Sequence, residues 1–145
     1  MTFVPPGVTY IPDAYAPSFH RALGVKVGIG DDGEGVAWVE LDREVHYGAR
    51  WAHGGLVGAL ADIASGITIA RRFEEPMGVI DGTIEMKTNF LRKAVEGDLT
   101  ATARVIKLGR RIAFTEVDVT SRGELVARAL ATFMLHEGAK RREDG

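Results

Sequence analysis

The segment His53–Arg72, HGGLVGALADIASGITIARR, decides the fold of this chain. It opens with the glycine pair Gly54-Gly55 and continues as an apolar run of helix length, in which Asp62 is the one carboxylate. A helix that is apolar on nearly all its sides is a buried one. The run is too short, and too interrupted by polar residues, to cross a bilayer. We therefore expect a soluble domain organised around one central helix.

The composition of the whole chain narrows the classes of protein to consider. At 145 residues, with 46% hydrophobic and 26% charged residues, it has the size and balance of one globular domain. The formal net charge of −2 gives no basic field, so we expect no nucleic-acid partner. The absence of cysteine excludes disulfides and thiolate metal sites and fits a cytoplasmic protein. We expect a single domain over 1–145, with 1–23 as an N-terminal extension and 137–145 as a flexible tail.

The sequence after the helix has the pattern of β-structure. Apolar and polar residues alternate over 83–91, 99–105 and 125–135, which predicts strands with one buried face. Short, glycine-containing breaks separate the strands, and short connections imply antiparallel pairing. Ahead of the helix, 25–42 predicts a strand–turn–strand unit, and 13–23 predicts a short helix closed by glycine. The predicted class is α+β: an antiparallel sheet curled over one long helix.

Two motifs carry a resemblance to a known family. His53-Gly54-Gly55 opens the helix, Leu60-Ala61-Asp62 places an acid nine residues after that histidine, and a second block, GRRIAFT, spans 109–115. Together they resemble the hotdog fold, and within it the PaaI-like acyl-CoA thioesterases, which include the phenylacetyl-CoA and 4-hydroxybenzoyl-CoA enzymes. The likeness runs from about residue 46 to residue 136. The family often has asparagine six residues before the motif histidine, where this chain has Tyr47.

The resemblance implies a function and an assembly. Members hydrolyse an acyl- or aryl-CoA thioester to the free acid and CoA, with no metal and no cofactor beyond the coenzyme A of the substrate. For this chain we expect self-association as a homodimer and a dimer of dimers, without a membrane or nucleic-acid partner. A serine or threonine early in the strand after the helix helps to hold the attacking water, and the alignment of that strand places it at Thr83.

The chemistry of these residues agrees with thioester hydrolysis. Free backbone N–H groups at a helix N-terminus can stabilise a developing oxyanion, and glycine lets a carbonyl approach them closely, so Gly54 and Gly55 suit that role. Asp62 would act as general base or nucleophile, because an acid in an apolar helix is costly unless it is paired or functional. The structural alternatives are that the glycines only form a turn, and that Asp62 is a core residue bonded to Ser65 or to the backbone.

The spacing along the helix predicts a site shared between subunits. Eight residues separate Gly54 from Asp62, which is about 12 Å at the helical rise of 1.5 Å per residue. A thioester carbonyl and its attacking water must each lie within about 3 Å of their catalytic groups. One helix can hardly serve one thioester with both residues. We expect Asp62 of one subunit to meet Gly54 of another across a two-fold axis.

The remaining polar residues divide into expected substrate contacts and peripheral groups. We expect His53 to brace the start of the helix beside the substrate, while His20 and His136 look peripheral. The acyl pocket would be lined by Trp51, Phe73 and Met77. Further expected substrate contacts are His46, Tyr47 and Ser65, and a phosphate clamp for CoA would come from Arg92, Lys93, Lys107, Arg110 and Arg111.

The sequence leaves two other functions open. A hotdog enoyl-CoA hydratase or dehydratase shares the fold but typically pairs a catalytic histidine with an acid, and the His-Phe-Pro pattern of the fatty-acid dehydratases is absent here. A non-catalytic acyl-CoA-binding module is the other alternative, kept open by Tyr47 in place of the family asparagine. Release of free CoA distinguishes the thioesterase from both.

Overall fold

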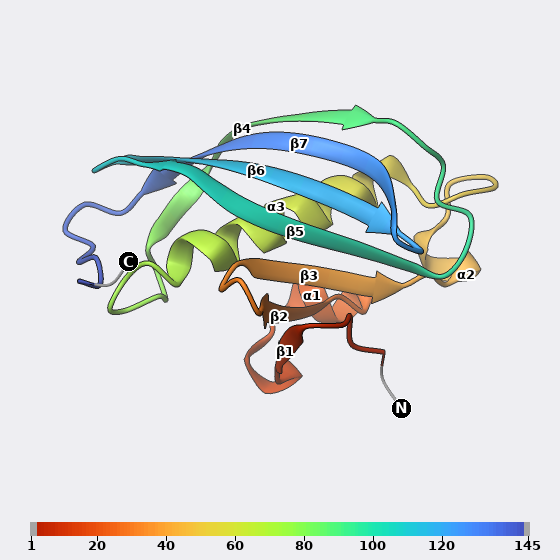
Figure 1. Ribbon diagram of the computed structural model, residues 1–145, viewed down its shortest axis with the longest axis horizontal. Coiled ribbons are helices and arrows are strands. Elements are labelled where there is room, and N and C mark those ends of the chain that lie inside the picture. The colour runs from red at the N-terminus through yellow and green to blue at the C-terminus, as the bar shows by residue number, and fades with distance from the viewer. Residues whose placement is uncertain (1–2, 144–145) are drawn as a thin grey trace.

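The computed structural model describes residues 3–143 as one antiparallel sheet curled around one long helix (Figure 1). The strands are β1 (Val8–Ile11), β2 (Lys26–Gly30), β3 (Gly35–Glu40), β4 (Ile80–Phe90), β5 (Asp98–Leu108), β6 (Ile112–Ser121) and β7 (Glu124–Leu135). The helices are η1 (Asp13–Tyr15, a 3₁₀ turn), α1 (Ser18–Leu23), α2 (Arg43–His46) and α3 (Gly54–Ala70). The predicted fold class is confirmed, and α3 is the predicted central helix.

The order of strands in the sheet is β1-β2-β3-β5-β6-β7-β4, and every neighbouring pair is antiparallel. The chain leaves β3, passes through α3, and returns at the far side as β4, which therefore forms one edge of the sheet. The strands β5, β6 and β7 follow as a meander in the middle, as the short breaks between them predicted. This order leaves β4 with one unpaired side, which is free to pair with another strand.

The core lies between α3 and the concave face of the sheet. Leu60, Ala61 and Ala64 of the helix have no exposed surface, and Leu99 and Val117 of the sheet are equally buried in the same cluster. Burial of a leucine side chain contributes about 1.5–3 kcal/mol to folding. The helix is therefore held along its length, and residues on it are placed firmly relative to the strands.

Two local predictions differ from the structure. Residues 13–23 do not form one helix, because Pro17 divides them into η1 and α1; the predicted closure by Gly24 is confirmed, with φ of 67°. The predicted buried face of β4 is also wrong: Ile84 and Phe90 are 52% and 60% exposed. This strand carries two register irregularities and lies at the edge of the sheet, so its alternation does not map onto one buried face.

Both ends of the described chain contact the domain. Within 1–23, β1 pairs with β2 from Val8 opposite Gly30 to Ile11 opposite Val27. Within 137–143, Arg141 forms a bridge with Phe73 just after α3. Among residues 3–143, no helix is long and apolar enough to span a membrane.

Candidate active site

The N-terminus of α3 is capped by His53 and leaves one amide free. The His53 Nδ1 accepts a hydrogen bond from the Gly55 N–H at 2.9 Å, and its carbonyl accepts the Leu56 and Val57 N–H groups. The Gly54 N–H has no hydrogen-bond acceptor within residues 3–143. The predicted bracing role of His53 thus matches the geometry. Of the two amides predicted as oxyanion donors, that of Gly55 is used by the cap, and that of Gly54 is free.

A cleft opens beside this free amide. It has a volume of about 410 Å³ and is lined by Trp51, Ala52, Gly54, Val57, Phe90, Leu91, Arg92, Lys93, Ala94 and Val126. A Cβ atom on Gly54 would lie 3.3 Å from the ring of Phe90, so glycine permits this close approach. The Lys93 ammonium lies 4.1 Å from the centre of the Trp51 ring. The lining is thus mainly apolar and aromatic with two cationic side chains, and it includes the predicted residues Trp51, Arg92 and Lys93.

The acid of the helix is bonded to the strand that follows it. The Thr83 hydroxyl donates to Asp62 Oδ1 at 2.6 Å, across the gap between α3 and β4. The side chain of Asp62 is only partly buried. The structural alternative that Ser65 bonds this acid is wrong, because Ser65 is fully buried and shares a hydrogen bond of 2.8 Å with Thr115. The predicted substrate contact of Ser65 is wrong for the same reason.

His46 and Tyr47 lie in the connection between α2 and α3. The His46 ring is 6% exposed; its Nδ1 accepts the Asp42 N–H at 2.9 Å, and its Nε2 lies 2.7 Å from the Leu23 carbonyl. Both ring nitrogens are therefore engaged with backbone, and the predicted substrate contact of His46 is wrong. Tyr47 forms an isolated bridge with Ala52, and the Arg43 guanidinium lies over its ring at 5.6 Å. This is the position of the family asparagine.

The predicted phosphate clamp is divided between two ends of the sheet. Arg92 and Lys93 follow β4 beside the cleft, whereas Arg110 and Arg111 lie in the turn between β5 and β6. Strands of this length span about 30 Å, at about 3.3 Å per residue. Arg111 pairs with Glu137 at 3.0 Å. Within one subunit these cations do not form one clamp.

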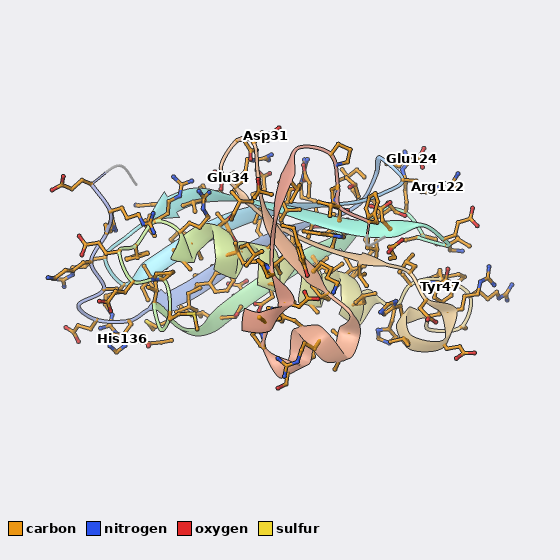
Figure 2. All side chains as sticks on the ribbon, turned by 90° about the horizontal axis from the view of Figure 1, so that it is seen from below. Asp31, Glu34, Tyr47, Arg122, Glu124 and His136 are labelled. Carbon is orange, nitrogen blue, oxygen red and sulfur yellow. The ribbon has the colours of Figure 1, made fainter. Side chains whose placement is uncertain are left out.

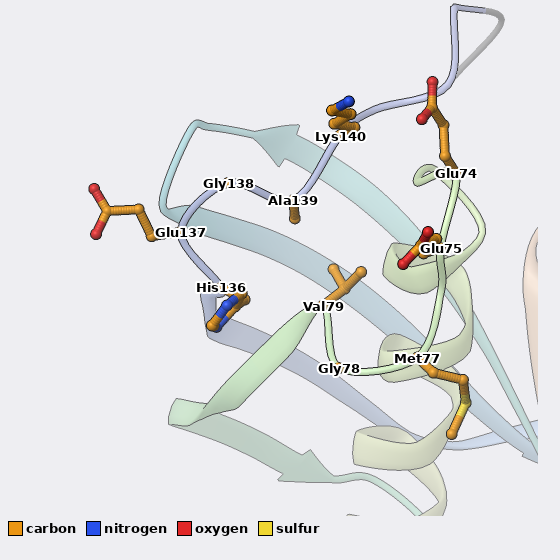
Figure 3. Close-up of a pocket in the computed structure, with 10 residues that line it drawn as sticks. All are labelled: Glu74, Glu75, Met77, Gly78, Val79, His136, Glu137, Gly138, Ala139 and Lys140. Carbon is orange, nitrogen blue, oxygen red and sulfur yellow. The ribbon is translucent and has the colours of Figure 1, made fainter.

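A second cavity lies at the opposite end of α3. It has a volume of about 360 Å³ and is lined by Glu74, Glu75, Met77, Gly78, Val79, His136, Glu137, Gly138, Ala139 and Lys140, and Figure 3 shows these side chains around it. Figure 2 shows His136 and Tyr47 at opposite ends of the molecule. Met77 therefore lies away from the helix N-terminus, and Phe73 is buried in the core. The predictions that these two residues line the acyl pocket next to Trp51 are wrong.

One histidine that the sequence analysis placed at the periphery has a partly buried ring. His20 of α1 has a buried Nδ1 with no hydrogen-bond partner among the described residues. Burial lowers the pKa of this ring, and the charge of Asp62 opposes that shift. The two residues are 42 positions apart, and no local pattern links a six-residue helix to a particular side of α3. In the described part of the chain, no three histidine or acidic side chains gather as a metal site would require.

Comparison with known proteins identifies the family. A sequence model of the thioesterase superfamily matches residues 51–127, more than half of the chain, including the helix start, Asp62 and Thr83. The chain belongs to the thioesterase superfamily. Its resemblance to hotdog thioesterases is thereby confirmed, and with it the expectation of an enzyme of the thioester-hydrolase class at the level of the family.

Individual members of the superfamily are similar over most of the chain. Human acyl-coenzyme A thioesterase 13 is 29% identical over 121 residues, covering 81% of this chain and 84% of that protein. The 1,4-dihydroxy-2-naphthoyl-CoA hydrolase of Listeria monocytogenes is 29% identical over 104 residues, covering 72% and 83%. The structure of zebra fish thioesterase superfamily member 2 is 32% identical with a TM-score of 0.68, covering 85% and 90%.

Proposed function

We propose that this protein is an acyl-CoA thioesterase that hydrolyses an acyl- or aryl-CoA thioester to the free acid and CoA. The observation that carries the proposal is the pairing of Thr83 with Asp62 on a helix whose first amide, that of Gly54, is free beside an apolar cleft. Similar superfamily members named acyl-CoA thioesterase and CoA hydrolase support the substrate class. The proposal names the class of substrate, an acyl- or aryl-CoA thioester, and no individual acyl group.

The proposed reaction uses groups of the chain in three roles. The Gly54 amide, at the positive end of the helix dipole, polarises the thioester carbonyl and stabilises the oxyanion. Asp62 takes a proton from water as the new C–O bond forms, or attacks directly to give a mixed anhydride that water opens. The Thr83 hydroxyl, bonded to Oδ1, orients that carboxylate and the water. When Asp62 acts as a base, the C–S bond then breaks and the proton held by Asp62 neutralises the departing thiolate. When Asp62 attacks directly, the C–S bond breaks as the anhydride forms, and a proton of the water that opens the anhydride neutralises the thiolate.

The proposed site is built by two subunits. Gly54 and Asp62 lie on one helix, about 12 Å apart at 1.5 Å per residue, which is too far for one thioester. The edge strand β4 passes both groups: Thr83 bonds Asp62, and Phe90 lies against Gly54. A second β4 could pair with this open edge in antiparallel orientation.

The positions along β4 specify how such a pairing would be centred. With the two-fold axis between Met86 and Lys87, Thr83 lies opposite Phe90 of the partner subunit. Asp62 then meets Gly54 of the partner subunit, and the symmetry makes two identical sites. A homodimer, and by extension a dimer of dimers, is therefore part of the proposed function, and it would also bring cations of different subunits around one CoA.

The test is release of free thiol from a panel of acyl-CoA thioesters, with the products identified by mass. We expect free CoA and the free acid in equal amounts from at least one substrate class. Addition of water across an enoyl-CoA without thiol release would instead show a hydratase. Tight acyl-CoA binding without any turnover would show the binding module, for which Tyr47 in the place of the family asparagine is the favouring observation.

A further inference from the structure

The face of the sheet that is turned away from α3 carries an apolar patch. Along β5, β6 and β7, buried residues that pack toward the helix alternate with more exposed ones on this outer face. The apolar patch consists of Ile106, Phe114 and Leu130, which are 59%, 41% and 49% exposed. Single exposed apolar residues are ordinary, but these three line one groove of about 400 Å³. Apolar surface gathered in this way is typical of a contact with another molecule.

The strand register brings the members of the apolar patch together. Phe114 lies opposite Lys107 of β5 and Thr132 of β7, and Leu130 precedes Thr132 by two residues on the same face. A register irregularity beside Ile106 leaves both Ile106 and Lys107 exposed. The patch is thus formed by neighbouring strands whose contributing residues are far apart in the chain.

Charges of both signs surround the apolar patch. On the same face, Arg104 pairs with Glu116 at 2.7 Å, and Arg128 pairs with Asp118 at 2.6 Å. An anionic membrane or a nucleic acid is bound by a predominantly basic surface, which this face is not. A balanced face with an apolar centre suits a second copy of itself, because a two-fold axis can place groups of opposite sign opposite each other.

The area of this face is too small for two single subunits. The patch and its rim extend over β4 to β7, about 19 Å across at about 4.8 Å between strands, and about 16 Å along strands that rise about 3.3 Å per residue. One subunit therefore offers about 300 Å². Two single subunits would bury about 600 Å² in total, whereas stable interfaces bury at least about 1,200 Å².

The proposed pairing of β4 doubles the available face. Antiparallel pairing continues the sheet across a two-fold axis perpendicular to it, so the patches of both subunits lie on the same side. Glu85 and Lys87 line the groove, and they lie beside the proposed axis between Met86 and Lys87. The two patches therefore adjoin in one face of about 600 Å², and two such dimers would bury about 1,200 Å².

We propose that the apolar patch is the surface through which two β4-paired dimers associate, with a second dimer of this chain as the partner. This inference rests on the assembly that belongs to the proposed function. The sheets pack face to face, about 10 Å apart, so that the side chains of the two patches interdigitate. Every copy of α3 then lies on the outside of the tetramer. Because a single subunit lacks the necessary area, β4 pairing precedes association of the dimers.

Sedimentation velocity over a range of protein concentrations tests the interface without turnover. We expect the wild-type protein to form a tetramer that dissociates into dimers on dilution. Ile106→Lys and Leu130→Lys each place a charge from every subunit in the interface, and should weaken the association of dimers at least about a hundredfold. The dimer itself should persist. Val45→Lys, at a residue of α2 that is 56% exposed, is the matched control and should leave the tetramer unchanged.

The possible outcomes distinguish this inference from the proposed function. A wild-type dimer that does not associate further would overturn the inference alone and leave the apolar patch to a different partner. A tetramer that persists in both patch variants would also overturn the inference alone. A wild-type protein that stays monomeric would overturn the site shared across β4 and this inference with it.

A milder substitution gives a second readout. The chain has no cysteine, so Ile106→Cys introduces a single thiol in the apolar patch. Its reaction with a maleimide should be about tenfold or more slower in the tetramer than in the diluted dimer, because a covered thiol reacts only while the interface is open. Val45→Cys, which is similarly exposed, should react equally fast in both states. Equal rates for Ile106→Cys in the two states would overturn the inference.

Discussion

Mixing two inactive variants should restore a defined fraction of activity if the site is shared between subunits. The variants are Asp62→Asn, which lacks the base, and Gly54→Val, whose Cβ would lie 3.3 Å from the Phe90 ring and block the carbonyl's approach to the amide. In a heterodimer, one site carries both changes and the other carries neither. With equal mixing, half of the dimers are heterodimers and half of their sites are intact, so about a quarter of wild-type activity should return.

The assay is thiol release after the two proteins have been incubated together until subunits exchange. Native mass spectrometry of differently tagged subunits confirms that exchange has taken place. An inactive mixture can then not be explained by a failure of the subunits to exchange. Each variant alone, treated in the same way, is the baseline. If the exchanged mixture stays at that baseline, Gly54 and Asp62 act within one chain, and the distance argument based on the rise of α3 is refuted.

Three further substitutions follow from contacts in the structure. Thr83→Val should lower kcat about tenfold or more in thiol release while leaving the thermal midpoint nearly unchanged. The Thr83 hydroxyl, on an exposed edge strand, donates to the proposed base Asp62 and would orient it. His53→Ala removes the cap on the Gly55 amide and should cost about 1 kcal/mol in urea unfolding; an unchanged midpoint would contradict the cap. The hydrogen bond from Arg128 lowers the pKa of Asp118, a stabilisation present above 3.8 and lost as the pH falls through the lowered value. Asp118→Asn should therefore lower the urea midpoint at pH 7, and the difference from wild type should shrink below pH 3.8.

The parts of the fold that could be predicted from the sequence are those set by local pattern. The helix from Gly54 to Ala70 follows from an apolar run with a capping residue in front, and the meander follows from alternation and short turns. The resemblance to hotdog thioesterases placed Thr83 at the site, and its hydrogen bond to Asp62 is seen only in the structure. The helix and the meander depend on residues close together in the chain.

The parts that could not be predicted depend on distant partners. Ser65 meets Thr115, fifty residues later, and no pattern around Ser65 indicates which hydroxyl lies across from it. The sequence suggested a loop position for His46, but its ring is buried and its Nε2 lies at hydrogen-bond distance from the Leu23 carbonyl. The burial of the His20 Nδ1 depends on where α1 docks. The free edge of β4, and with it the shared site, appears only once the strand order is known.

The measurement that tests the role of Asp62 most directly is the rate of free-thiol release by Asp62→Asn beside the wild-type protein. Asp31→Asn, in the turn between β2 and β3 shown in Figure 2, is the matched control for exchange of a carboxylate for an amide. We predict a loss of at least about a hundredfold in Asp62→Asn, with the fold intact by circular dichroism, and no loss in the control. Equal rates in Asp62→Asn and wild type would contradict the proposed mechanism.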